Sequence, residues 1–298
     1  MFKHILVPLD GSHLAEAALA PAALIAETLG APVTLIHIIE QEAPREVHKD
    51  RHLTKTDEAL AYLREVAARA FPSTTKVETH VHSAAVENVA QSIVEHAQEE
   101  FAPDLIVMCT HGKSGVRGLL FGSIAQQVVA HGTTPLLLVR PKPTGGGFQL
   151  KKIFVPLDSE SIHDDSLTLS EELARAFDAE LYLLSVVPTF GTLAGEQAAT
   201  SSMLPVTTTA LLDIKEENAR EHLQEHLDAL RASGLRATAE VARGDPASEI
   251  VKSAEKAGAD LIVLSTHRRA GMGAFWARSV APKVANRSSL PLLLIPLK

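Results

Sequence analysis

The chain repeats itself, and this internal repeat constrains the fold more than any other feature of the sequence. Three pairs of segments match: 3–10 with 151–158, 104–111 with 260–267, and 135–139 with 291–295. The offset is eight residues larger in the last two pairs, which places an insertion in the second copy between its second and fourth strands. A chain of 298 residues is also long enough for two domains. We therefore expect two copies of one domain.

Each copy alternates short apolar runs with helical patterns. In the first copy the expected strands are 4–9, 33–39, 76–82, 105–109 and 136–139, and the expected helices are 12–29, about 60–70, 88–100 and 123–131. Runs of Val, Ile and Leu between helices are typical of parallel strands buried on both faces. Strand–helix alternation implies right-handed crossovers. We predict an α/β protein of two Rossmann-like domains, each a five-stranded parallel sheet with helices on both faces.

The boundaries follow from composition. The segment PKPTGGGFQ at 141–149 combines proline with glycine, which is typical of a linker. We expect a first domain at 1–141, a linker at 142–150 and a second domain at 151–298. The stretch 188–213 is rich in Ser, Thr, Ala and Gly. It is predicted to be a mobile loop, either a lid or a tolerated insertion.

The segment after the fourth strand carries the strongest candidate site. Cys109-Thr-His-Gly112 is followed after nine residues by Gly122-Ser123, which opens a helix. Parallel sheets bind ligands beyond the carboxyl ends of their strands, and helix N-termini attract phosphate. Gly112 and Gly122 would let backbone N–H groups approach phosphate oxygens. The alternative is that these glycines only shape a turn and that Ser123 only caps the helix.

Asp10 ends the first strand, at the edge where a ligand crevice would open. Its carboxylate could face a ribose hydroxyl or a phosphate bridged by a metal ion. The alternative is an Asx-type turn, because Asp followed by Gly-Ser is a common turn sequence.

Together these segments resemble the universal stress protein family. The resemblance rests on VPLDGS near the start, His37-Ile38, DLIVM, THGKSG, FGS and PLLLVRP. It covers nearly the whole chain twice, apart from the linker and 188–213. It implies a tandem member whose domains have the Rossmann-like, adenine nucleotide alpha hydrolase-like fold. ATP-binding members carry Gly, two residues, Gly, nine residues and then Gly-Ser or Gly-Thr.

The resemblance also implies a nucleotide site in the first copy. Asp10 would lie near the ribose and Ile38 at the adenine, with the phosphates at the glycine loop. The residues implied at the site are Pro8, Leu9, Asp10, Ile38, Met108, Cys109, His111, Gly112, Gly122, Ser123 and Ile124. The implied cofactor is ATP or AMP, and a Mg²⁺ ion at the phosphates is compatible with it.

Both copies depart from the family pattern. In the first copy, Cys109 replaces the first glycine, and Glu87 stands where many members have a Gly-x-Pro loop. In the second copy all three glycines are replaced, by Ser265, Arg268 and Arg278. We therefore expect nucleotide in the first copy and a structural, pseudo-dimer role for the second, with 136–139 and 292–295 pairing within the chain.

The function expected from these observations is regulatory. The chain would be a stress-response protein that binds ATP or AMP in its N-terminal domain. No Gly-x-Ser-x-Gly, His-Glu-x-x-His or Cys-x-x-Cys segment supplies a nucleophile or metal-activated water, so no catalytic residue is expected. Two alternatives remain open: a weak Mg²⁺-dependent ATPase, and a scaffold that binds no nucleotide.

Composition narrows the partners. The net charge is -8 and the pI about 6.0, without a basic run, which argues against nucleic acid. No apolar run reaches the ~20 residues that a membrane span needs. Cys109 is the single cysteine, so no disulfide can form within the chain, as expected in a reducing compartment. We expect a cytoplasmic protein, and association into a homodimer is compatible with the sequence.

Four histidines form two closely spaced pairs. His48 and His52 are four residues apart, and His80 and His82 are two apart. Helical and strand geometry would place each pair on one side of its element. The four would form a zinc site if the two segments converged. The alternative is solvated histidines in a charged segment.

Overall fold

The computed structural model describes residues 1–110, 123–141, 147–158, 165–193, 199, 203–267 and 280–297. Its internal contacts divide the chain into two compact units. The first contains Met1–Gln149, Thr266–Ser279 and Pro291–Lys298, and the second contains Leu150–Ser265 and Val280–Leu290.

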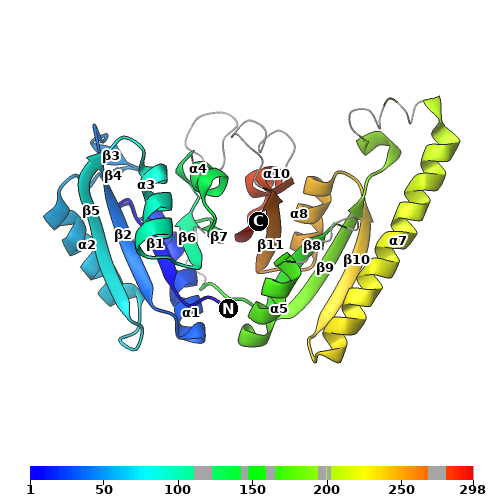
Figure 1. Cartoon of the computed structure of the whole chain (residues 1–298), viewed down its shortest axis with the longest axis horizontal. Coiled ribbons are helices and arrows are strands. Elements are labelled where there is room, and N and C mark those ends of the chain that lie inside the picture. The colour runs from blue at the N-terminus through cyan, green and yellow to red at the C-terminus, as the bar shows by residue number, and fades with distance from the viewer. Residues whose placement is uncertain are drawn as a thin grey trace. The chain divides into compact units, whose positions relative to one another are not determined.

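The first unit is built on strands with helices packed over both faces (Figure 1). Its elements are β1 (Ile5–Pro8), η1 (Ala15–Ala18), α1 (Leu19–Leu29), β2 (Val33–Glu40), β3 (Glu46–Val47), β4 (Asp50–Arg51), α2 (Thr56–Ala70), β5 (Val77–Val86), α3 (Val89–Glu95), η2 (His96–Glu100), β6 (Leu105–Cys109), α4 (Ser123–His131) and β7 (Leu136–Val139). Its main sheet runs β7-β6-β1-β2-β5, and all of these neighbours are parallel. This confirms the predicted five-stranded parallel sheet.

Burial explains why the central strands form. Every residue of β6 and β7 is buried, as are all but the last residues of β1 and β2. Such strands need apolar side chains on both faces, which their Val, Ile and Leu residues supply. Helices α1 and α2 contact each other, as do α3 and α4, and the two pairs cover opposite faces (Figure 1).

The second unit repeats the same plan. Its elements are β8 (Lys152–Leu157), α5 (Asp165–Phe177), β9 (Glu180–Val187), η3 (Phe190–Thr192), α7 (Pro205–Ala232), β10 (Ala237–Arg243), α8 (Pro246–Lys256), β11 (Leu261–His267) and α10 (Val280–Arg287). The strand order is β10-β9-β8-β11, and these pairs are parallel. The two α/β units together confirm the predicted fold class.

The last strand of the chain belongs to the first unit. β12 (Leu292–Leu297) pairs antiparallel with β7, and Leu292, Leu293 and Leu294 lie opposite Leu138, Leu137 and Leu136. This confirms the expected pairing of the last strands of the two repeats. The pairing also protects the edge of β7, because an unpaired apolar strand would present open hydrogen-bonding groups.

The expected mobile loop at 188–213 is wrong in its last part. Helix α7 begins at Pro205. Proline is tolerated there because the N–H group that it lacks would have no partner within the helix at this position. The hydroxyls of Thr208 and Thr209 donate to the carbonyls of Leu204 and Pro205, so the polar residues are satisfied within the helix. The Ser/Thr-rich composition misled the sequence interpretation because these hydroxyls bond locally in a helix as well as in a loop.

Other boundaries shift slightly. The helix expected at 12–29 is a 3-10 turn, η1, followed by α1. β5 extends to Val86, four residues beyond the expected end at 82. The helix expected at 88–100 is α-helical only to Glu95, and η2 continues it as a π-helix.

An aspartate of the repeated DLIV segment fastens the first strand of each copy. The carboxylate of Asp104 accepts hydrogen bonds from the backbone N–H groups of Lys3, at 2.7 and 2.9 Å, and of His4, at 3.0 Å. In the second copy, Asp260 accepts from the N–H groups of Lys151 and Lys152, at 2.8 and 3.0 Å. The same carboxylate therefore satisfies the N–H groups that begin the first strand of each sheet.

This fastening predicts a stability loss on mutation. Asp104→Ala should lower the free energy of unfolding by about 1–3 kcal/mol, because it removes a charged acceptor from two backbone donors. Asp104→Asn should lose less, because the amide oxygen still accepts. Chemical denaturation measures both, with Glu27→Ala on the exposed side of α1 as the control. Equal stabilities for Asp104→Ala and wild type would contradict the role given to this carboxylate.

Candidate functional site

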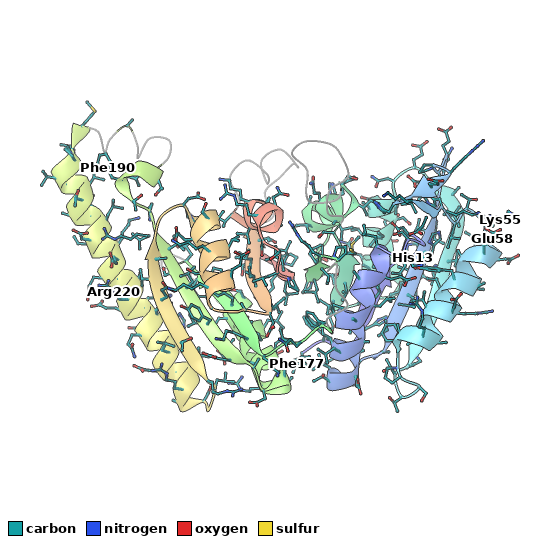
Figure 2. The ribbon with its side chains drawn as sticks, turned by 180° about the vertical axis from the view of Figure 1, so that it is seen from behind. His13, Lys55, Glu58, Phe177, Phe190 and Arg220 are labelled. Atoms are coloured by element: carbon teal, nitrogen blue, oxygen red, sulfur yellow. The ribbon has the colours of Figure 1, made fainter. Side chains whose placement is uncertain are left out.

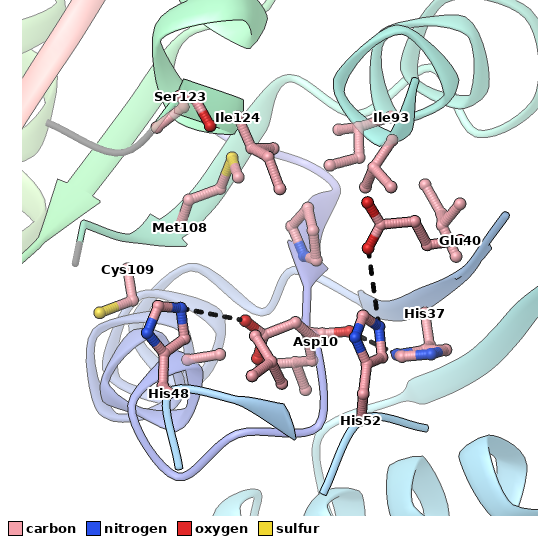
Figure 3. Close-up of a pocket in the computed structure, with 17 residues that line it drawn as sticks. Asp10, His37, Glu40, His48, His52, Ile93, Met108, Cys109, Ser123 and Ile124 are labelled. Carbon is pink, nitrogen blue, oxygen red and sulfur yellow. Dashed lines mark hydrogen bonds and ion pairs between the residues drawn. The ribbon is translucent and has the colours of Figure 1, made fainter. Parts of the chain in front are cut away.

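A cavity of about 230 Å³ opens at the carboxyl ends of β1, β2 and β6 in the first unit (Figure 3). Most of the predicted site residues line it: Pro8, Leu9, Asp10, Ile38, Met108, Cys109, Ser123 and Ile124. His111, Gly112 and Gly122 lie outside the described residues. The cavity is also lined by residues that the sequence interpretation did not place there: Ala15, His37, Glu40, Val47, His48, His52, Val89, Ile93 and Ala125.

One side of the cavity is apolar. Ile38 comes from β2, Met108 comes from β6, and Ile93 comes from α3. All three are nearly fully buried, whereas Ile124, in the first turn of α4, is 36% exposed. Figure 3 shows Met108, Ile93 and Ile124 on the side of the cavity opposite Asp10 and His48, so these side chains form an apolar wall. Such a wall suits the flat face of an aromatic ring.

Asp10 provides the negative charge after β1. Its Oδ1 accepts from the backbone N–H of Ser12 at 2.9 Å and from the Ser12 hydroxyl at 2.6 Å. This is the Asx turn that the sequence left as one alternative. Oδ2 lies 3.8 Å from Nε2 of His48 (Figure 3). One carboxylate therefore both shapes the turn and lines the cavity.

Gly11 is required by this turn. Its φ of +88° lies in the left-handed region, where side chains with a Cβ are strained. A Cβ at this position would also lie 2.8 Å from Cδ1 of Leu53. The glycine of the DGS segment therefore lets a later part of the chain pack directly on the loop after β1.

Leu53 follows a short hairpin, β3–β4 (residues 46–51), which we call the clasp. Its two turn residues, His48 and Lys49, have φ values of +52° and +75°. A two-residue turn with two positive φ values matches the twist of a hairpin, but residues other than glycine pay about 1 kcal/mol or more each for it. The turn places the imidazole of His48 against Asp10.

Polar contacts hold the clasp in place. The carboxylate of Asp50 accepts from the backbone N–H of His13 at 2.9 Å and faces its Nδ1 at 3.0 Å. Arg51 donates to Glu58 at 2.8 Å. Figure 2 shows His13 in the loop before α1 and Glu58 beside Lys55 at the start of α2. The clasp is thus held by the loop before η1 and by helix α2 of the same unit.

His37 connects the cavity to Leu53, which lies between the clasp and α2. Its ring is 1% exposed, with Nδ1 2.8 Å from the carbonyl of Leu9 and Nε2 3.0 Å from the carbonyl of Leu53. The imidazole therefore bridges the end of β1 to the segment between the clasp and α2. The sequence interpretation had noted His37 only as the neighbour of Ile38.

His52 leaves one polar atom unsatisfied beside the cavity. The residue is 7% exposed, its Nε2 lies 3.9 Å from Oε2 of Glu40, and its Nδ1 is buried without a hydrogen-bond partner (Figure 3). An unpaired buried polar group costs about 1–3 kcal/mol. A polar ligand atom in the cavity could remove that cost.

Cys109 lines the cavity as an unreactive thiol. Burial, and then the charge of Asp10, raise the pKa of the Cys109 thiol to about 12. Its Sγ lies 3.6 Å from the carbonyl of Thr110. The thiol stays protonated at neutral pH and lacks the thiolate that nucleophilic chemistry needs. Glu87, the other departure noted in the sequence, is exposed and does not line the cavity.

The two histidine pairs do not converge. His48 and His52 line the cavity, whereas the side chains of His80 and His82 gather with His96. The four-histidine zinc site considered from the sequence is therefore wrong. The pairing of His80 and His82 on one side of a strand is confirmed.

Comparison with known proteins identifies the family. The model of the universal stress protein family matches residues 1–140 and again 149–296. The chain belongs to the universal stress protein family. The double match makes it a tandem member, as the sequence repeat predicts.

Curated relatives are similar in sequence to about half of this chain, and a solved structure is similar in fold to nearly all of it. A universal stress protein of Methanocaldococcus jannaschii is 30% identical over 145 residues, which cover 49% of this chain and 81% of the relative. One of Staphylococcus haemolyticus is 30% identical, over 50% of this chain and 90% of the relative. The crystal structure of a universal stress protein from Archaeoglobus fulgidus covers 98% of this chain and 96% of its own, with a TM-score of 0.70 and 15% identity. That likeness shows a shared fold.

Within the part of the chain that the structure describes, this universal stress protein contains no helix of the length and apolar character that a membrane crossing requires.

The His13–Asp50 contact should make the clasp sensitive to pH. The hydrogen bond to Asp50 raises the pKa of His13, and hydrogen bonds from the backbone and side chain of His13 lower the pKa of Asp50. The stabilisation that protonated His13 gives the folded state is present below its ordinary pKa of 6.5 and is lost as pH rises through the raised pKa. The stabilisation that ionised Asp50 gives is present above its ordinary pKa of 3.8 and is lost as pH falls through the lowered pKa. The ion pair thus exists between the two shifted pKa values.

The contact can be checked in the universal stress protein by NMR titration. In Asp50→Asn the pKa of His13 should fall toward 6.5, and Asp57→Asn, an exposed acid in the first turn of α2, should leave it unchanged. Added salt should reduce the wild-type shift, because both side chains face solvent. An identical His13 pKa in wild type and Asp50→Asn would show that the contact does not form.

Proposed function

We propose that this universal stress protein binds an adenine nucleotide, ATP or AMP, in the cavity of its first domain and serves as a regulatory binding protein in the stress response. The observation that carries the proposal is the cavity itself. It lies at the carboxyl ends of adjacent parallel strands, with an apolar wall on one side and the Asp10 carboxylate on the other. Sheets of this kind bind nucleotides at this place.

The apolar wall fits the base. Ile38, Met108 and Ile124 offer apolar surface to the cavity, and a purine ring gains free energy by leaving water there. The unpaired Nδ1 of His52 supplies a polar partner that an exocyclic or ring nitrogen of the base could satisfy. The residues present therefore fit an adenine.

The polar side fits the sugar and the phosphates. Asp10 lines the cavity with a carboxylate, which accepts strongly from ribose hydroxyls. Ser123 begins α4 and lines the same cavity, and the N-terminus of a helix attracts phosphate. The glycines Gly112 and Gly122, with His111, complete the phosphate segment by their place in the sequence. A Mg²⁺ ion would join through the phosphates.

The lining supports binding rather than turnover. The Cys109 thiol is protonated, and Asp10 already accepts two hydrogen bonds from Ser12. Among the described residues that line the cavity there is no lysine or arginine to stabilise charge on a transferring phosphate. The bound nucleotide would act by holding the clasp and the start of α4 in one arrangement.

The second domain, proposed to span 151–298 after a linker at 142–150, is a structural partner of the first domain at 1–141. Its last strand, β12, completes the sheet of the first unit beside β7. Arg268 and Arg278 replace glycines of the phosphate segment, so this copy lacks the small residues that let a backbone approach phosphate. The two repeats would form a pseudo-dimer within one chain.

Substitution at the apolar wall tests the proposal. Ile124→Arg should weaken ATP and AMP binding at least about tenfold, because it places a charged stem where the base would lie, and calorimetry of the purified chain measures this. Ile124 is 36% exposed, so the fold should tolerate the change. The matched control is Ile214→Arg on α7, an isoleucine that is 55% exposed and does not line the cavity.

A second variant tests the proposed contact between Asp10 and the ribose. Asp10→Asn keeps an oxygen for Ser12 but removes the charge, and it should weaken both nucleotides about tenfold. Wild-type affinity in both Ile124→Arg and Asp10→Asn would place the nucleotide elsewhere. No binding to the wild-type chain would favour the scaffold alternative.

A further inference from the structure

Three imidazoles meet on the outer strand of the parallel sheet of the first unit. His80 and His82 project from the same face of β5, because alternate residues of a strand share a face. His96 begins η2 and packs its ring against both, with ring centres 5.3 Å from His80 and 4.8 Å from His82. One ligand nitrogen from each ring lies within 4.8 Å of the others.

A hydrogen bond fixes which nitrogen His96 offers. Nδ1 of His96 lies 2.7 Å from the carbonyl oxygen of Ser92, so it carries the proton and donates it there. In the neutral ring, Nε2 then holds the lone pair and is the nitrogen available to a metal ion. A backbone carbonyl on the far nitrogen is the partner that orients metal-binding histidines in proteins.

A carboxylate completes the group. Oε2 of Glu100 lies 3.4 Å from Nε2 of His96, and Oε1 lies 3.9 Å from Nδ1 of His80. The helical segment that carries His96 and Glu100 is a π-turn, in which the N–H of Phe101 donates to the carbonyl of His96 at 2.9 Å. Such turns occur often at functional sites, where they re-aim side chains.

Phe101 supports the rings from behind. Its ring centre lies 5.1 Å from that of His80, edge to face, and 5.9 Å from that of His96, stacked. His96 is 8% exposed, so its ring is held by packing.

We propose that His80, His82, His96 and Glu100 form a zinc site. Three imidazole nitrogens and one carboxylate oxygen are a donor set that suits tetrahedral Zn²⁺ and that Mg²⁺ and Ca²⁺ avoid. Zn–N bonds of about 2.0–2.1 Å place ligand nitrogens about 3.3 Å apart in a tetrahedron. From separations of up to 4.8 Å, the rings reach that distance by closing on the ion.

The site is separate from the nucleotide cavity, since none of its four ligands lines the cavity. Among the described residues β5 is an edge strand that pairs with β2, and the site joins it to the helical segment after α3. Bound zinc would therefore fasten the edge of the sheet, and nucleotide binding could fail while this proposal holds.

Metal titration of the full chain tests the site. The protein is freed of metal with a chelator, and Zn²⁺ is added in competition with a chromophoric indicator. We expect one tightly bound equivalent, raised thermal stability on zinc addition, and a tetrahedral visible spectrum with Co²⁺. His80→Asn/His82→Asn should weaken Zn²⁺ at least about 100-fold, and Glu100→Gln about tenfold.

The chain offers a matched control. His222 and His226 face each other on α7 with their Nε2 atoms 3.2 Å apart, a helical pair that supplies only two imidazoles. His222→Gln/His226→Gln should keep the tight equivalent. The proposal is overturned if this control loses it, or if wild type and His80→Asn/His82→Asn bind Zn²⁺ equally. If the double variant does not fold, Glu100→Gln provides the test, because Glu100 is exposed. Unchanged zinc affinity and an unchanged Co²⁺ spectrum in this variant would show that Glu100 is not a ligand. A non-tetrahedral Co²⁺ spectrum of the wild type would overturn the whole site.

Discussion

The cavity exists because the chain leaves two neighbouring parallel strands in opposite directions. From β1 it crosses to β2 on one side, and from β6 it crosses to β7 on the other, so the direction of the strand order reverses between β1 and β6, which is the place where open parallel sheets bind ligands. The repeated aspartate, Asp104, holds the other end of the same pair by binding the N–H groups that begin the first strand. Hydrogen bonds therefore hold the amino end of β1, and the carboxyl ends of the same strands border the cavity.

The open edge is then closed in part by a strained element. The clasp turns through two residues with positive φ, His48 and Lys49, and it stays in place because Asp50 accepts a hydrogen bond from the backbone of His13 in the loop after β1. Strain of this kind persists only where the surroundings fix it, and it concentrates at functional sites. It brings His48 to Asp10 and leaves the Nδ1 of His52 unpaired beside the cavity. Stability and binding are thus linked at the same residues.

Local patterns predicted the sheet and one side of the cavity well, because strand runs and strand ends are written in neighbouring residues. Asp10 was found in this way, because it follows the first strand, whereas Ile38 and Met108 were placed at the site by the resemblance to the family. The clasp and the partner of His80 and His82 were missed. Both depend on contacts between segments separated in sequence, such as His13 with Asp50 and His82 with His96, for which a single sequence carries no period or spacing. The start of α7 was missed for a different reason, because its threonines satisfy their hydroxyls within the helix.

The division between a nucleotide-binding first repeat and a structural second repeat is the central claim, and the count of bound nucleotides tests it most directly. Native mass spectrometry of the purified chain, with and without added ATP and Mg²⁺, gives that count. The account predicts one nucleotide per chain. Two per chain would show that the second repeat binds despite its arginines, and none would show that the cavity of the first repeat serves another purpose.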